Sequence, residues 1–211
     1  MVPFTLLAQR GCTSHASLAL ALTAEFASVR AQRAAAALDG LAACLQGARD
    51  DRPEAQLHAV ADVVGAHLEA IELDCAIDDL LLDRVVIGGA GHPLLLAVAS
   101  VEAGRRSGLA LGVVAGADGA FVAHQRLADP IVVDAATGLL LDARSLAAPV
   151  SWQCSHQVVA RILNRIGERA ERVGHLAWAL RAAELRLALP FEGDARERLE
   201  ADLRRVRARL N

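Results

Sequence analysis

The chain has no lysine, and the side chains whose spacing could support chemistry are acids, histidines and cysteines. All 22 basic residues are arginine, which removes Schiff-base formation, pyridoxal phosphate attachment and a P-loop lysine together. His92 is the most informative histidine, since it stands between Gly91 and Pro93 at the start of a predicted helix. A histidine at this place could act as an acid or base. The alternative is that His92 caps the helix or faces solvent.

Two other segments bring a cysteine and a histidine close together in the sequence. Cys154 and His156 are two residues apart and could form a nucleophile and its base, or two ligands of a metal ion. Cys12 and His15 are three residues apart and could supply two ligands. A structural zinc site takes four ligands, and no second pair accompanies either segment. We therefore expect no metal site, and the wide spacing of the four cysteines predicts no disulfide framework.

The elements that must position these residues change character along the chain. Residues 14–106 are predicted to be mostly helical, with an Ala- and Leu-rich segment at 17–48 and a further helix that starts near Pro53. Another helix covers roughly 93–106. Short apolar or β-branched runs separated by glycines and turn residues then predict a small antiparallel sheet. These runs are 109–114, 120–124, 131–133 and 139–141.

The helical period returns after residue 156. Gly174 separates two predicted helices, and Glu192-Gly193-Asp194 can cap a third. This is the outline of a helical repeat, and a single repeat cannot bury its own apolar face. The third helix carries such a face, with apolar residues spaced by three and four positions: Leu199, Leu203, Val206 and Leu210.

Length, composition and charge narrow the class of protein. The 211 residues, 54% hydrophobic and 22% charged, exclude an intrinsically disordered chain and predict one domain, or one domain with a small appendage. No apolar run approaches the ~20 residues of a membrane span, and the first residues lack the basic start of a secretory signal, so we expect a cytoplasmic protein without membrane contact. The basic excess after residue 155 alternates with acids at helical spacing. We therefore expect no nucleic-acid partner, although a weaker hypothesis keeps a DNA- or regulator-binding role for this end.

The segments around the predicted helix at 93–106 are similar to a known family. The run Gly91-His92-Pro93-Leu94-Leu95-Leu96, followed by Val101–Leu109, resembles the G-N-P-I-S-L … E-V-A-R-R-L-G-L segment of the SirB-type transglutaminase-like family, which carries a TPR-like tail. Residues 79–86 lie where this family has its N-S-Y-L-N-E-V-L approach.

Further pieces of the resemblance follow in the order and spacing of the family, from about residue 18 to 205. Residues 112–113 and 119–122 look like its G-V and G-H-F-L-V strands, and Asp134 with Thr137-Gly138 looks like its D-P-F-N-G-G turn. The TPR consensus is matched at Gly167, Gly174 and Ala179.

The resemblance implies an α+β fold: a transglutaminase-like, papain-like core with a small antiparallel sheet, an N-terminal helical layer and TPR-like C-terminal helices. It implies a transglutaminase-like domain at 1–150 and a helical tail at 151–211 packed on that core. In this family the chemistry needs a cysteine at a helix N-terminus, a histidine as its base and an acid that orients the histidine. These positions fall on Pro93, Ala120 and Asp134, so the thiol and the base are both missing.

Two hypotheses about function follow. The first is a non-catalytic accessory or binding protein, which uses the degenerate cleft for a small-molecule ligand and the C-terminal helices for a protein partner. The second is an enzyme with a rebuilt site, formed by His92 and Asp134 with Asp118 or His124, acting on an amide, an ester or a small metabolite. Apolar walls in the cleft favour binding, whereas titratable groups within hydrogen-bonding reach of each other favour chemistry. We expect no cofactor.

Overall fold

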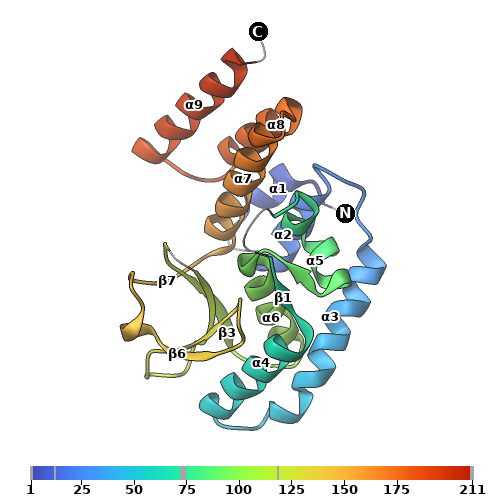
Figure 1. Ribbon diagram of the computed structural model, residues 1–211, viewed down its shortest axis with the longest axis vertical. Coiled ribbons are helices and arrows are strands. Elements are labelled where there is room, and N and C mark those ends of the chain that lie inside the picture. The colour runs from blue at the N-terminus through green and yellow to red at the C-terminus, as the bar shows by residue number, and fades with distance from the viewer. Residues whose placement is uncertain (1, 12, 72–74, 118, 210–211) are drawn as a thin grey trace. The chain divides into compact units, whose positions relative to one another are not determined.

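The computed structural model describes residues 2–11, 13–71, 75–117 and 119–209 (Figure 1). It combines helices with a small antiparallel sheet, so the predicted α+β class is confirmed. The chain forms two compact units. One unit joins the residues before Arg30 to those after Gln153 and is named the helical unit; the other spans Arg30–Gln153 and is named the sheet unit. Within the described ranges, none of the helices has the length and apolarity needed to cross a bilayer.

Helices make up the first part of the sheet unit. α3 (Ala31–Leu45) and α4 (Pro53–His67) are linked through a short 3-10 turn, η1 (Gln46–Ala48). A second 3-10 turn, η2 (Asp78–Leu80), precedes α5 (Leu82–Gly88). β1 (Glu69–Ala70) and β2 (Ala90–Gly91) form a parallel pair of two residues each.

The helix α6 (Pro93–Arg106) is the centre of the sheet unit. Every residue from Pro93 to Gly104 is buried, which explains the nearly unbroken apolar sequence of this helix. Its C-terminal turn is fixed by charge: Glu102 accepts hydrogen bonds from Arg105 and Arg106, and Arg106 also pairs with Asp39 of α3. Burial raises the pKa of Glu102, but the hydrogen bonds and charges of the two arginines outweigh it and hold that pKa below its ordinary value.

Five short strands form the antiparallel sheet in the order β6-β5-β4-β3-β7. Their bounds are β3 (Leu111–Ala115), β4 (Ala120–His124), β5 (Ile131–Asp134), β6 (Leu140–Asp142) and β7 (Ser151–Trp152). The first four fall on the four runs that the sequence predicts as strands. β7 is not among the predicted strands, because two residues are too few for a strand pattern; it pairs with β3, with Val114 opposite Trp152.

Different parts of the chain cover the two faces of the sheet. α6 packs on β3 and β4, and Gly104 of α6 lets Leu111 approach its backbone closely. On the other face, side chains of β3, β4 and β5 form a second apolar cluster under the connection from β6 to β7, which contains the 3-10 turn η3 (Ala143–Ser145). That cluster consists of Val114, Phe121, Ala123 and Val132, packed against Leu141, Ala143, Leu146 and Val150.

The helical unit contains helices from both ends of the chain. α1 (Phe4–Ala8) and α2 (His15–Thr23) come first, and α7 (Ser155–Arg172), α8 (Leu176–Leu187) and α9 (Gly193–Ala208) complete it. The expected helices after residue 156 and the break at Gly174 are both present. Leu203 and Val206 of the predicted apolar stripe are buried, Leu199 is half-buried, and Leu210 lies outside the described residues.

The Ala- and Leu-rich segment at 17–48 is not continuous helix. α2 ends at Thr23 and α3 begins at Ala31, because the backbone N–H of Arg30 donates to the buried carboxylate of Asp83, 53 positions later in the sequence. This long-range hydrogen bond replaces one that a continuous helix would make locally. The break also separates the two units: α2 packs against α7, so residues that we assigned to a domain at 1–150 group here with the C-terminal helices.

Candidate functional site

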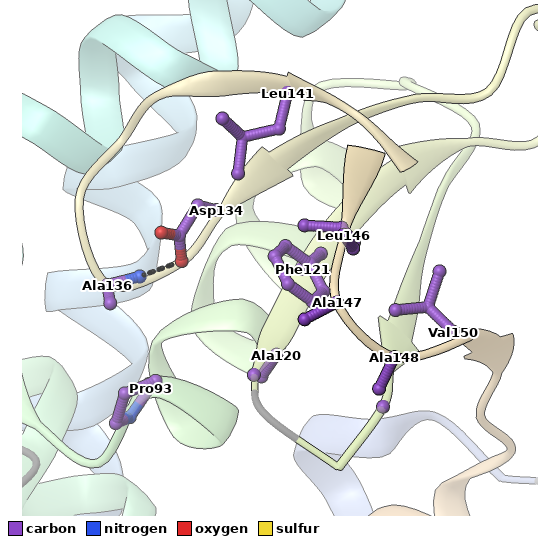
Figure 2. Close-up of a pocket in the computed structure, with 12 residues that line it drawn as sticks. Pro93, Ala120, Phe121, Asp134, Ala136, Leu141, Leu146, Ala147, Ala148 and Val150 are labelled. Atoms are coloured by element: carbon purple, nitrogen blue, oxygen red, sulfur yellow. Dashed lines mark hydrogen bonds between the residues drawn. The ribbon is translucent and has the colours of Figure 1, made fainter. Parts of the chain in front are cut away.

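A cavity of about 200 Å³ lies in the sheet unit, where the start of α6 meets the end of the sheet (Figure 2). Its walls come from Pro93 of α6, the turn between β3 and β4, the first residues of β4, the connection from β5 to β6, and the loop at 146–150. Pro93, Ala120 and Asp134, the three positions taken from the family resemblance, all line it. The cavity is therefore the natural candidate for a functional site.

The helix start at the cavity has no N–H group to offer. Pro93 occupies the first helical position and has no backbone N–H. The next amide, of Leu94, donates to Nδ1 of His92 at 3.2 Å, and the amides of Leu95 and Leu96 donate to the carbonyl oxygen of His92. Such N–H groups form anion sites and oxyanion holes when they are available. Here the helix satisfies them itself.

His92 is the N-cap residue of α6. Its Nδ1 accepts from Leu94, so the ring nitrogen nearest the backbone is committed to the cap. His92 is half-buried but does not line the cavity, and no hydrogen bond joins it to Asp134 among the described residues. The structure thus places His92 beside the candidate site in a capping role, one of the two roles that the sequence left open.

Asp134 is the one ionisable side chain in the described part of the cavity lining. It ends β5 and fixes the turn to β6: Oδ1 accepts from the amide of Ala136 at 2.9 Å, and Oδ2 accepts from the hydroxyl of Thr137 at 2.9 Å. Figure 2 shows the carboxylate beside Ala136. The turn closes with the amide of Gly138 donating to the carbonyl oxygen of Asp134. The carboxylate is therefore held in one orientation by its own turn.

The strand register separates Asp134 from Ala120. Asp134 lies directly opposite Phe121 in the antiparallel pair of β4 and β5. Successive side chains of a strand point to opposite faces, so Asp134 shares a face with Phe121, and Ala120 points to the other face. Both positions nevertheless line the cavity, which lies at the end of the strands. A histidine at position 120 would therefore not face the carboxylate across the sheet.

His124 lies at the opposite end of β4 from the cavity, roughly 13 Å away at ~3.3 Å per residue. It is 3% exposed, and its two ring nitrogens are both satisfied. Nδ1 accepts from the amide of Arg126 at 3.1 Å, so Nε2 carries the proton and donates to Oε1 of Gln56 at 2.8 Å. The amide group of Gln56 in turn donates to the carbonyl oxygens of Arg49 and Asp51.

Burial lowers the pKa of His124, the charge of Arg126 lowers it further, and Glu54 opposes both. The imidazole is therefore kept neutral, in the tautomer that the network requires. His124 joins α4 and the turn before it to the sheet, and it does not reach the cavity.

The other candidates from the sequence fall elsewhere. Asp118 and Cys12 lie outside the described residues. Cys154 is the N-cap residue of α7, and its amide donates to the side chain of Gln157. His156 is buried in the first turn of the same helix. In the ranges that the structure covers, no three His, Cys, Asp or Glu side chains are grouped so as to hold a metal ion.

The loop at 146–150 is the part of the site that sequence reasoning missed. The cavity is lined there by Leu146, Ala147, Ala148 and Val150. Two of these residues, Leu146 and Val150, also pack on the second apolar cluster of the sheet. A signal was present in the sequence: the stretch Leu-Ala-Ala-Pro-Val has no polar side chain, although loops at the surface are usually polar. An apolar loop between two strands indicates that it covers something apolar.

Comparisons of this chain with family models, with curated proteins and with solved structures find no match.

Proposed function

We propose that this chain is a non-catalytic binding protein whose cavity at the start of α6 accepts one small apolar group. The observation that carries the proposal is the composition of the cavity: its described walls are alanine, leucine, valine, proline, glycine and phenylalanine, with a single carboxylate. Ligand sites typically combine apolar walls with a few fixed polar groups. The volume exceeds the ~150 Å³ of an engineered cavity that binds benzene and falls short of the ~300 Å³ at which drug-sized pockets begin.

The same cavity lacks the parts that acyl transfer needs. Pro93 supplies neither a nucleophile nor an N–H, Ala120 supplies no base, and the carboxylate of Asp134 is bound within its own turn. The alternative enzyme would need His92 and Asp134 to act together. His92 instead caps α6, so the arrangement supports binding better than it supports a rebuilt active site.

We further propose that the sheet unit has a transglutaminase-like core. Three features support this: the resemblance of the sequence, the order of a central helix followed by antiparallel strands, and the convergence of Pro93, Ala120 and Asp134 on one cavity. On this proposal the cavity is the former active site, and its substitutions have turned it from a reaction site into a binding site.

The experiment that tests the proposed function compares two variants of the same kind. Ala148→Phe places a ring into the cavity, whereas Ala55→Phe places one on the exposed surface of α4. Small apolar probes such as benzyl alcohol should bind the unmodified chain and Ala55→Phe, as seen by ligand-observed NMR, and should not bind Ala148→Phe. Binding that survives in Ala148→Phe would place the site elsewhere.

A second measurement addresses catalysis. Activated esters and amides should show no turnover above that of buffer. Turnover by the unmodified chain that is lost in His92→Ala or Asp134→Ala would replace the binding proposal with the rebuilt-site enzyme.

A further inference from the structure

We propose that the ligand of this cavity is a small primary amine, bound as an ammonium ion with its apolar body among the cavity walls and its cationic head on Asp134. The inference rests on the proposed function, since it names the class of ligand for the same cavity. It follows from three properties of Asp134: its unused acceptor capacity, its lack of a cationic partner and its fixed orientation.

The first property is the number of hydrogen bonds that the carboxylate still can accept. An ionised carboxylate has about four acceptor positions on its two oxygens. The turn uses one on Oδ1, for Ala136, and one on Oδ2, for Thr137. About half of the capacity is therefore left for a ligand, and an ammonium group brings donors and no acceptor.

The second property is the absence of a countercharge. Among the described residues, no arginine or histidine pairs with Asp134, and none lines the cavity. Two buried acids of the sheet unit differ: Glu102 is paired with Arg105 and Arg106, and Asp83 is paired with Arg84. A half-buried carboxylate next to apolar walls gains most from a cation, because water screens the attraction less there than at the surface.

The charge of the whole sheet unit favours the same sign of ligand. Residues 30–153 contain nine arginines and sixteen acids, which gives a net charge of −7. A field of that sign attracts cations and repels anions. Phosphorylated and carboxylated ligands are therefore disfavoured twice, by this field and by the satisfied amides at the start of α6.

The third property is that the carboxylate does not have to be ordered when the ligand binds. The turn bonds of Asp134 hold it in place, so the ligand does not bear the entropy cost of ordering this side chain. The cavity volume of about 200 Å³ then sets the size of the apolar body at a single ring or a short alkyl chain. Benzylamine is a probe of this size.

The experiment uses three probes of nearly equal shape at constant ionic strength: benzylamine as the cation, benzyl alcohol as the neutral form and benzoate as the anion. Their affinities are measured by NMR titration for the unmodified chain, for Asp134→Asn and for Asp142→Asn. Asp142 is a matched control, because it is an exposed acid on the neighbouring strand β6, outside the cavity lining, and is paired with Arg144.

We expect the unmodified chain to bind benzylamine at least about tenfold more tightly than benzyl alcohol, since hydrogen bonds to charged groups contribute about that much. Asp134→Asn should reduce this preference to about twofold or less, whereas Asp142→Asn should keep it. If benzyl alcohol binds as tightly as benzylamine, or benzoate binds best, the amine inference is wrong while the proposed binding function stands. If none of the three binds, both are wrong.

Discussion

The two ends of strand β4 have opposite characters. At the end with Ala120, the strand borders a cavity with apolar walls and one carboxylate. At the other end, His124 is buried in a network in which each ring nitrogen has a partner. A titratable group lies near each end, the half-buried Asp134 of β5 at the cavity and the buried His124 in the network, and only His124 has its hydrogen-bonding capacity fully used. The comparison teaches what the unused hydrogen-bonding capacity of a titratable side chain indicates. Where donors or acceptors remain unused beside a cavity, the residue indicates a binding site; where all of them have partners in the protein, it indicates a structural role.

The strongest test of this comparison removes the network. His124→Leu leaves Oε1 of the buried Gln56 without its donor and the amide of Arg126 without its acceptor, which should lower the free energy of unfolding by about 2–4 kcal/mol. Urea denaturation measures the change. The matched control is His58→Leu, an exposed histidine on α4, which should change stability by no more than about 0.5 kcal/mol. Equal effects of the two variants would contradict a structural role of His124.

A second variant tests how the cavity end is anchored. Gly138, in the turn that Asp134 closes, has a φ of +72°, and a Cβ on it would lie 2.7 Å from the backbone nitrogen of Gly65 in α4. Gly138→Ala should therefore cost about 2–3 kcal/mol, from backbone strain and from overpacking. Gly108→Ala is the control: its φ is +83°, but its Cβ would meet only the flexible side chain of Arg49, at 3.3 Å. We expect a cost of about 1–2 kcal/mol there, from strain alone.

The difference between these two glycine variants, measured by urea denaturation in the same buffer, isolates the contact between the turn and α4. A Gly138→Ala protein as stable as Gly108→Ala would show that the turn does not rest on α4.

The network should also make stability depend on pH. The pKa of His124 is lower in the folded chain than its ordinary value of about 6.5, because burial disfavours the charged ring. Below that value the unfolded chain takes up the proton first, so stability should be complete above pH ~6.5 and fall as the pH falls toward the folded pKa. The free energy of unfolding, measured by urea denaturation at several pH values between 7.5 and about 5, reports this loss. The slope should be flatter in His124→Leu, and an unchanged slope would assign it to other groups.

The smallest effect is expected at the cavity end. Asp134→Asn keeps an oxygen that can accept from the amide of Ala136, and its NH₂ group can donate to the hydroxyl of Thr137 in place of accepting from it. Stability should change by less than about 1 kcal/mol. Asp134→Leu, which removes both acceptors of the turn, should be clearly less stable than Asp134→Asn. If Asn proves as damaging as Leu, the charge of Asp134 has a structural role, which weakens the case for a ligand.

The sequence was sufficient to predict four of the five strands of the antiparallel sheet and three positions that line the cavity. The turn residues and β-branched runs between 109 and 143 predicted four strands of a small antiparallel sheet, and the family resemblance selected Pro93, Ala120 and Asp134, which line one cavity. Local pattern was enough because hairpins join neighbouring segments of the chain.

Other features depend on contacts that no local window contains. The break before α3 rests on the hydrogen bond from Arg30 to Asp83, and the role of His124 rests on Gln56, 68 positions away. The pairing of β4 with β5 places Asp134 opposite Phe121 and so on the other face of the sheet from Ala120. If the two strands were paired one residue out of this register, Asp134 and Ala120 would lie on the same face. For that reason a double variant with Pro93→Cys and Ala120→His, which looks from the sequence like a restored triad, should not become an amidase.

The way in which the helical unit is assembled has a consequence for synthesis on the ribosome. Leu18 and Leu22 of α2 are buried in the finished protein, and α7, against which α2 packs, begins only at Ser155. At ~5–20 residues per second, roughly 7–26 seconds pass between the completion of α2 and the appearance of α7. The whole sheet unit emerges during that interval and can fold without waiting. The leucines of α2 are meanwhile an exposed apolar segment of the nascent chain, the kind of sequence to which chaperones bind.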